Sequence, residues 1–472
     1  MISSSTVRNG ETFRWVVVST VLFCSLLTAV GALRAGPVTL TLEGAIELAL
    51  ESDEMLRQAS EAVTGARADV LEAKSNAMPH LTIAGQYGRN VIKPSFFLPE
   101  EFRQGTDMPA RVDIGEDNDF VGAATLTQVL WAAGRVSAGL SAAREFLSSY
   151  SCREATTADY VRFGAREAYF GALLAAEFVR ISEKALEETE EATRVAQAGY
   201  RAGTVSRFDV MRAEVELANR KTPLVKARND LDQALTVLRR RCGLEPETEI
   251  ILVDSLEEVS DPPPIETVVG IMRNENAELR GLEHYVEARR QFLRIAKAER
   301  YPMLQLSANY GIQTQWSGGT FPEEELVADN ASIAIGFQIP IFDGLSAKGK
   351  IGRAEADLRT AEIELARVER DKALAVRQAW LSLENAITAL EGRVEAVRLA
   401  EEAHRLSIIR LENGLATPLE RLDAELAMTT ARGQLAEALY TCKISEAYLE
   451  LSVGSADFLK AVTGDEEGRD HE

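Results

Sequence analysis

Residues 304–313 read Leu-Gln-Leu-Ser-Ala-Asn-Tyr-Gly-Ile-Gln, so that apolar and polar side chains alternate. A period of two predicts a β-strand with one apolar and one polar face. Residues 81–88 and 332–339 repeat the alternation, whereas residues 121–129 carry it weakly and leave their facing ambiguous. Such strands suit a transmembrane barrel with a polar lumen, but an ordinary half-buried soluble sheet alternates identically.

The membrane alternative has a consequence for assembly. Four strands cannot close a barrel, because about eight are needed to surround an interior that side chains can fill. An open sheet in lipid would leave backbone groups unpaired along its edges, at a cost of several kcal/mol per group. Several chains would therefore have to contribute strands to one barrel.

The N-terminus has the features of an export signal. Arg8 and Arg14 precede an apolar run over residues 15–33, which ends in small residues. This order predicts a signal peptide over residues 1–32 that is removed on export. The alternative is an uncleaved anchor helix, since the run can just span a bilayer. Cys24 lies in the middle of the run behind Phe23, where lipidation is not expected.

The chain contains an internal repeat. A shift of about 223 residues places Tyr87-Gly88 on Tyr310-Gly311, and a shift of about 211 places Gly203 on Gly414. The change of offset between residues 90 and 120 predicts a loop insertion in the first half. An acidic stretch containing three consecutive prolines, at 262–264, links the halves.

Each half predicts the same order of elements: an amphipathic helix, two strands, and two long helices. The leading helices are expected at about 42–77 and 265–300, ended by Pro79 and Pro302. The long helices would reach roughly 100 Å, which suggests coiled-coil packing. The predicted layout is a first repeat at 41–254 (strands about 80–90 and 120–129, long helices about 134–200 and 205–242), a linker at 255–264, a second repeat at 265–454 (strands about 303–315 and 331–340, long helices about 345–412 and 417–452) and an acidic tail at 455–472.

Composition excludes several function classes. Lys and Arg number 52 against 73 Asp and Glu, a net charge of −21 that disfavours nucleic-acid binding. The four His share no ligand spacing, and the Cys beyond the signal peptide show no metal-type pairs, so they are expected to be buried free thiols. No catalytic constellation or phosphate loop is present, and we expect neither enzymatic activity nor a cofactor or metal.

Two turn motifs join the long helices. The first runs from Gly199 through Tyr200, Gly203 and Asp209, and the second from Arg410 through Gly414 to Glu425. The two glycines can adopt the left-handed conformation that ends a helix. Ser206 and Thr417 are suitable N-caps for the helices that follow.

The doubled turn and the segment Gln338-Ile-Pro-Ile-Phe-Asp-Gly344 resemble the TolC-like family of outer-membrane efflux proteins. In this resemblance Pro340, Phe342 and Gly344 mark a strand-to-helix junction, and Trp131 marks a degraded counterpart in the first half. It implies a mostly α-helical homotrimer in which each chain gives four strands to one β-barrel above an α-helical tunnel. Such a protein is a passive duct in the Gram-negative outer membrane, extending into the periplasm. It works with a periplasmic adaptor and an inner-membrane pump, in tripartite efflux or type I secretion.

The resemblance also implies an acidic gate at the tapered end of the tunnel. Glu420 and Asp423 match the acidic positions of the last helix, and Asp209 matches an acid that latches the closed gate. The partners of that latch are replaced here by Leu411 and Ala416, so we expect weaker polar locking. Without the resemblance, these acids would be ordinary residues of a solvated helix N-terminus, where the dipole favours them. The alternative function is a periplasmic coiled-coil scaffold or envelope structural protein without channel activity.

Overall fold

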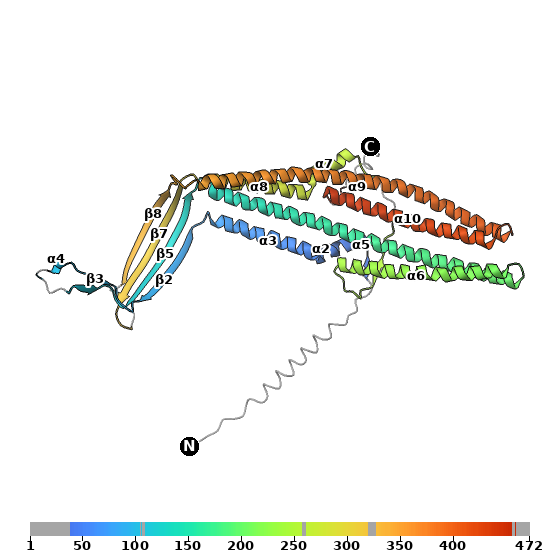
Figure 1. Ribbon diagram of the computed structural model, residues 1–472, viewed down its shortest axis with the longest axis horizontal. Coiled ribbons are helices and arrows are strands. Elements are labelled where there is room, and N and C mark those ends of the chain that lie inside the picture. Colours follow the sequence, from blue (N-terminus) through green and yellow to red (C-terminus); the bar gives the residue numbers. More distant parts are fainter. Residues whose placement is uncertain are drawn as a thin grey trace, which may run out of the picture. The chain divides into compact units, whose positions relative to one another are not determined.

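The computed structural model describes residues 38–455 and Phe458, apart from residues 104, 106–108, 257–260 and 320–326 (Figure 1). The expected signal peptide lies outside these residues, as do most of the acidic tail and part of the linker. The chain divides into two compact units. Among the described residues, the first unit holds 38–53, 161–256 and 385–447, and the second holds 54–160, 261–384 and the residues from 448.

The two repeats have the same order of elements. The first consists of α2 (Leu42–Ser52), α3 (Glu54–Ser75), β2 (His80–Arg89), β5 (Asn118–Trp131), α5 (Arg135–Arg201) and α6 (Arg207–Arg241). The second consists of α7 (Ile265–Glu275), α8 (Ala277–Ala298), β7 (Met303–Trp316), β8 (Val327–Gln338), α9 (Ser346–Glu412) and α10 (Pro418–Val453). None of the helices within the described residues has a stretch with the length and hydropathy that crossing a bilayer requires.

Each leading helix is broken in two, whereas the sequence predicted one continuous helix. The breaks fall at Asp53 and Asn276, whose ψ angles of 125° and 115° are extended rather than helical. The side chain of Asn276 then accepts a hydrogen bond of 3.1 Å from the Leu279 backbone N–H and so caps α8. Asn and Asp compete locally with helical hydrogen bonding in this way, and hydrophobic periodicity alone does not reveal it.

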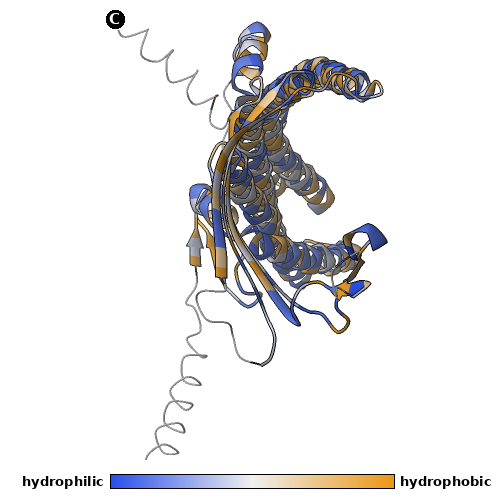
Figure 2. Cartoon of the chain, turned by 90° about the vertical axis from the view of Figure 1, so that its left-hand side faces the viewer, coloured by the Kyte–Doolittle hydropathy of each residue, from blue (hydrophilic) through white to orange (hydrophobic). Residues whose placement is uncertain are grey.

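Strands β2, β5, β7 and β8 form one antiparallel sheet in that order, and the strands lie side by side in Figure 1. Side chains of directly paired residues point to the same face. The register therefore places a row of apolar residues from each of the four strands on one face of the sheet. The rows contain Leu81, Ile83 and Tyr87 of β2, Phe120, Ala124 and Leu126 of β5, Ala308, Tyr310 and Ile312 of β7, and Ile333, Ile335 and Phe337 of β8. The opposite face is mainly polar or small, and there the Thr125 hydroxyl donates to Asn309 Oδ1 at 3.0 Å. Figure 2 shows apolar and polar residues interspersed along these strands.

The register resolves the facing of β5, which the sequence left ambiguous. Ala124 pairs with Ile83 on one side and with Tyr310 on the other, so its side chain belongs to the apolar face. The sheet ends at β2 and β8, which have no strand neighbour on their outer sides within the described residues. Every residue of β8 is exposed in the single chain, as are all but one of β2.

Two small sheets accompany the repeats. β3 (Ser95–Phe97) and β4 (Arg111–Asp113) form a hairpin around α4 (Glu100–Arg103), within the segment where the sequence predicted an insertion. β1 (Val38–Leu40) pairs in parallel with β6 (Ile250–Leu252) in the first unit, where no strand was predicted.

The core of the first unit is built around Tyr169, which is fully buried. Its hydroxyl lies 3.0 Å from the Leu40 carbonyl oxygen and 2.7 Å from Oδ2 of Asp254. The same carboxylate oxygen accepts from the backbone N–H of Leu42 at 2.8 Å. The Tyr169 phenol and Asp254 together therefore hold the start of α2 and the ends of β1 and β6. Burial raises the pKa of Tyr169 well above its usual range.

Candidate functional site: helix-turn tips and strand-to-helix junction

The two tips, where α5 turns into α6 and α9 turns into α10, have the same backbone geometry. Gly203 and Gly414 have positive φ angles of 80° and 69°, as predicted for a left-handed helix end. Their backbone N–H groups donate to carbonyl oxygens three residues earlier. The N–H of the residue after each glycine donates to the carbonyl oxygen of Gly199 or Arg410, five residues earlier. An added Cβ at either glycine would meet no atom within 4 Å, so the backbone angle rather than space requires glycine here.

Each tip is followed by a reciprocal cap. The Ser206 hydroxyl accepts from the Asp209 backbone N–H at 3.2 Å and donates to Oδ2 of Asp209 at 2.6 Å. Thr417 accepts from the Glu420 N–H at 3.3 Å, and its hydroxyl donates to Oε1 of Glu420 at 3.3 Å. Two of the three predicted gate acids thus have a local structural role at a helix N-terminus, where negative charge is also favoured.

The third acid differs from the other two. Asp423 is exposed and lies one turn beyond Glu420 on α10. Glu420 also lies 4.0 Å from a guanidinium nitrogen of Arg410, which partly balances its charge.

In the first tip Tyr200 is 46% exposed, and the guanidinium of Arg207 lies 5.9 Å from the centre of its ring.

The predicted strand-to-helix junction of the second repeat lies between β8 and α9. Asp343 caps α9, since its side chain accepts from the backbone N–H groups of Leu345 at 3.0 Å and Ala347 at 2.7 Å. Gly344 and Leu345 both have positive φ, 65° and 72°. Phe342 does not pack inside the single chain, where it is 84% exposed.

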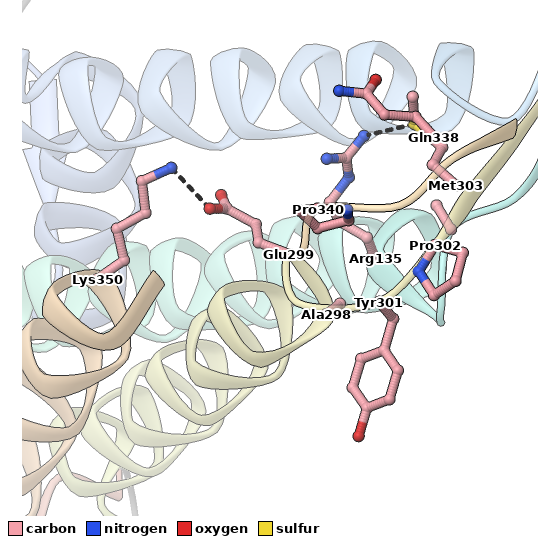
Figure 3. Close-up of a pocket in the computed structure, with 10 residues that line it drawn as sticks. Arg135, Ala298, Glu299, Tyr301, Pro302, Met303, Gln338, Pro340 and Lys350 are labelled. Atoms are coloured by element: carbon pink, nitrogen blue, oxygen red, sulfur yellow. Dashed lines mark hydrogen bonds and ion pairs between the residues drawn. The ribbon is translucent and has the colours of Figure 1, made fainter. Parts of the chain in front are cut away.

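Pro340 borders a hollow of about 310 Å³ beside this junction (Figure 3). Lys350 forms an ion pair of 2.6 Å with Glu299, and Arg135 Nη2 approaches the Met303 sulfur at 3.4 Å. The first-repeat junction is built similarly, because Ala133 and Gly134 have φ angles of 49° and 80°. Trp131, the last residue of β5, follows a bulge and is 46% exposed.

The sequence did not indicate a further group of polar residues on the long helices. Glu188, His404 and Glu425 come from α5, α9 and α10 and place one potential ligand atom each within 4.8 Å of one another. They are 216 and 21 positions apart in the chain, so no spacing motif could have revealed them.

Comparisons with known proteins agree with the fold. The family described as outer membrane efflux protein matches residues 45–244 and 268–455. The alkaline protease secretion protein AprF of Pseudomonas aeruginosa is 25% identical over 323 residues, which cover 66% of this chain and 63% of that protein, somewhat under two thirds of its length.

Solved structures show the same architecture. The outer membrane protein VceC of Vibrio cholerae superposes with a TM-score of 0.69 at 20% identity, covering 88% of this chain and 96% of that one. The open state of the Neisseria gonorrhoeae MtrE outer membrane channel gives 0.70 at 20% identity, covering 88% and 89%. The resemblance inferred from the turns and the junction is confirmed, and this chain belongs to the outer membrane efflux protein family.

Proposed function

We propose that this chain forms the outer-membrane duct of a tripartite efflux or type I secretion system, a passive conduit from the periplasm to the exterior. The observation that carries this proposal is the four-stranded sheet, which has one mainly apolar face and two outer edges without a strand partner among the described residues. Such a sheet is not a complete structure in either water or lipid, because both its apolar face and its edges need partners.

A homotrimer supplies those partners. Three copies would contribute twelve strands, more than the roughly eight that enclose a filled barrel, and so leave room for an open lumen. The strands have 10 to 14 residues, and a tilted membrane strand needs about 9–11. The apolar face would contact outer-membrane lipid and the polar face would line the lumen.

Exposed apolar residues at the junction support the same assembly. Ile341 and Phe342 are 95% and 84% exposed in the single chain, and Leu345 is 66% exposed. Bulky apolar side chains clustered in this way mark an interaction surface. We place the contact with the neighbouring subunit or the lipid boundary here, at the base of the barrel.

The long helices would form the periplasmic tunnel. α5 and α9 each have 67 residues, about 100 Å at 1.5 Å per residue. Their tips would carry the acidic gate, with Glu420 and Asp423 facing the pore in three copies and Asp209 beside them. The duct would meet a periplasmic adaptor and an inner-membrane pump that supplies the energy, in keeping with the family and with the secretion role in the name of AprF.

The gate is tested by ion selectivity in planar bilayers. Asp423→Asn should reduce the preference for cations over anions, because a ring of carboxylates attracts cations. Glu420→Gln should have a smaller effect, since Thr417 and Arg410 already engage that carboxylate. Glu437→Gln, an exposed acid farther along α10, is the matched control.

An unchanged reversal potential in Asp423→Asn, or an equal change in Glu437→Gln, would refute the gate. A protein that yields no heat-sensitive oligomer from membrane extracts and no conductance would instead be the coiled-coil scaffold.

A further inference from the structure

Glu188, His404 and Glu425 form a polar cluster inside the helical part of the first unit. Glu425 is fully buried and His404 is 8% exposed. Nε2 of His404, Oε2 of Glu188 and Oε2 of Glu425 are all inaccessible to water and have no hydrogen-bond partner. A buried polar atom without a partner costs about 1–3 kcal/mol, and more if it is charged. Each of the three residues has such an atom, and each places a potential ligand atom within 4.8 Å of the other two, which indicates that something else binds there.

The geometry of the cluster fits a small cation. An ion at the centre of a triangle with 4.8 Å sides would lie about 2.8 Å from each corner, against about 2.0–2.2 Å for Zn²⁺ bound to nitrogen or oxygen. The side chains would therefore move inward by less than about 1 Å, well within rotamer adjustment.

The remaining atoms are arranged to orient such ligands. Oε1 of Glu425 accepts a hydrogen bond of 2.8 Å from the Thr189 hydroxyl. The other oxygen, Oε2, has no hydrogen-bond partner and remains free to bind an ion, while Thr189 holds the carboxylate as an outer partner holds a metal ligand.

The donor set selects among metals. One imidazole nitrogen and two carboxylate oxygens suit Zn²⁺ and neighbouring divalent transition metals. Ca²⁺ and Mg²⁺ prefer six or more oxygen ligands and fit poorly here. Two carboxylates would balance the charge of the ion.

Cationic residues near the cluster oppose a metal. Arg220, Arg421 and Arg432 act electrostatically on its members. Arg220 is ion-paired with Glu216 at 3.0 Å and Arg432 with Glu401 at 2.8 Å, which partly offsets their charges. Arg421 is the rival, because its guanidinium could neutralise the carboxylates in place of a metal.

We propose that Glu188, His404 and Glu425 bind one divalent transition-metal ion per chain, with Zn²⁺ the best match and water completing the coordination. The ion would join α5, α9 and α10. Since Glu425 follows Glu420 by five residues on α10, the ion would fix this helix close to the tip.

The test is metal binding to the purified full-length chain in detergent, stripped of metal with a chelator. Titration with Zn²⁺ should show one ion per chain, and Co²⁺ should give the visible absorption of a site with a nitrogen ligand. His404→Ala and Glu425→Gln should each weaken Zn²⁺ binding by at least about 100-fold. His284→Ala is the matched control, because His284 pairs with Glu145 at 2.8 Å outside the cluster.

Three results would overturn the proposal. The first is that the wild-type protein binds no stoichiometric Zn²⁺. This result does not depend on the folding of any variant, and it would mean that Arg421 neutralises the carboxylates in place of a metal. His404→Ala could bind Zn²⁺ as tightly as the wild type. His284→Ala could lose binding to the same degree. Helical circular dichroism and the heat-sensitive oligomer on gels show that each variant compared is folded.

Discussion

The orientation of the sheet can be tested at two adjacent residues of β8. Ile333 is the seventh of the twelve residues of the strand, is 79% exposed in the single chain and lies in the apolar row opposite Ala308. Ala334 is its neighbour on the polar face, opposite Ser307. Replacing either residue by Lys introduces the same charge at nearly the same height but on opposite faces of the sheet.

The expected magnitude follows from the position of Ile333. A Lys facing lipid near the middle of a barrel strand costs about 2–4 kcal/mol, so that a trimer carrying three copies would lose about 6–12 kcal/mol. A Lys in a water-filled lumen carries no such penalty. Ile333→Lys should therefore abolish or strongly weaken the assembled barrel, and Ala334→Lys should leave its stability within about 1 kcal/mol of the wild type.

The measurement is reversible folding into lipid vesicles, titrated with guanidinium and followed by the heat-sensitive oligomer on gels. Equal tolerance of both Lys variants would mean that neither face of the sheet contacts lipid. A stable Ile333→Lys combined with a disrupted Ala334→Lys would mean that the faces are inverted. Either result would refute the argument from the register.

Two further predictions concern the helical part of the first unit. Tyr169→Phe should lower the free energy of unfolding by about 1–3 kcal/mol, because it removes the buried hydroxyl between Leu40 and Asp254. Thermal unfolding followed by circular dichroism measures this change. Tyr160 is 55% exposed, so Tyr160→Phe is a control that should change stability little. Burial raises the pKa of the Cys242 thiol from 9.0 to about 11, so at pH 8 the native chain should hold about 100-fold less Cys242 thiolate than the unfolded chain. Alkylation with iodoacetamide, read by mass spectrometry, should then be slow until the chain is unfolded, and equal rates in both states would contradict this burial.

The parts of the fold that sequence could predict are those with strong local signals. Alternation over residues 304–313 indicated β7 and its facing, and the glycines of the turns indicated both tips. The facing of β5 could not be read in the same way, because Val121, Ala123 and Ala124 are small or apolar on both faces. Only pairing with Ile83 and Tyr310 decides it, and pairing is a property of the assembled sheet.

The remaining differences have similar causes. The breaks at Asp53 and Asn276 depend on single backbone conformations that do not disturb the helical hydrophobic pattern. β1 and β6 have three residues each, too few for a periodicity. The cluster of Glu188, His404 and Glu425 needs three helices in register, so its members look like unrelated polar residues along the chain.

The predicted gate acids occupy two kinds of position in the repeats. With the shift of 211 residues, Glu420 falls on Asp209, and both acids close a reciprocal cap with the Ser or Thr three residues earlier. An acid at this position therefore stabilises a helix N-terminus in either half, whether or not a pore is nearby. Asp423 falls on Arg212, which is also exposed, so the second tip carries a negative charge where the first carries a positive one. The cap cannot account for Asp423, and for this reason we expect the cation preference of the pore to depend on Asp423 more than on Glu420.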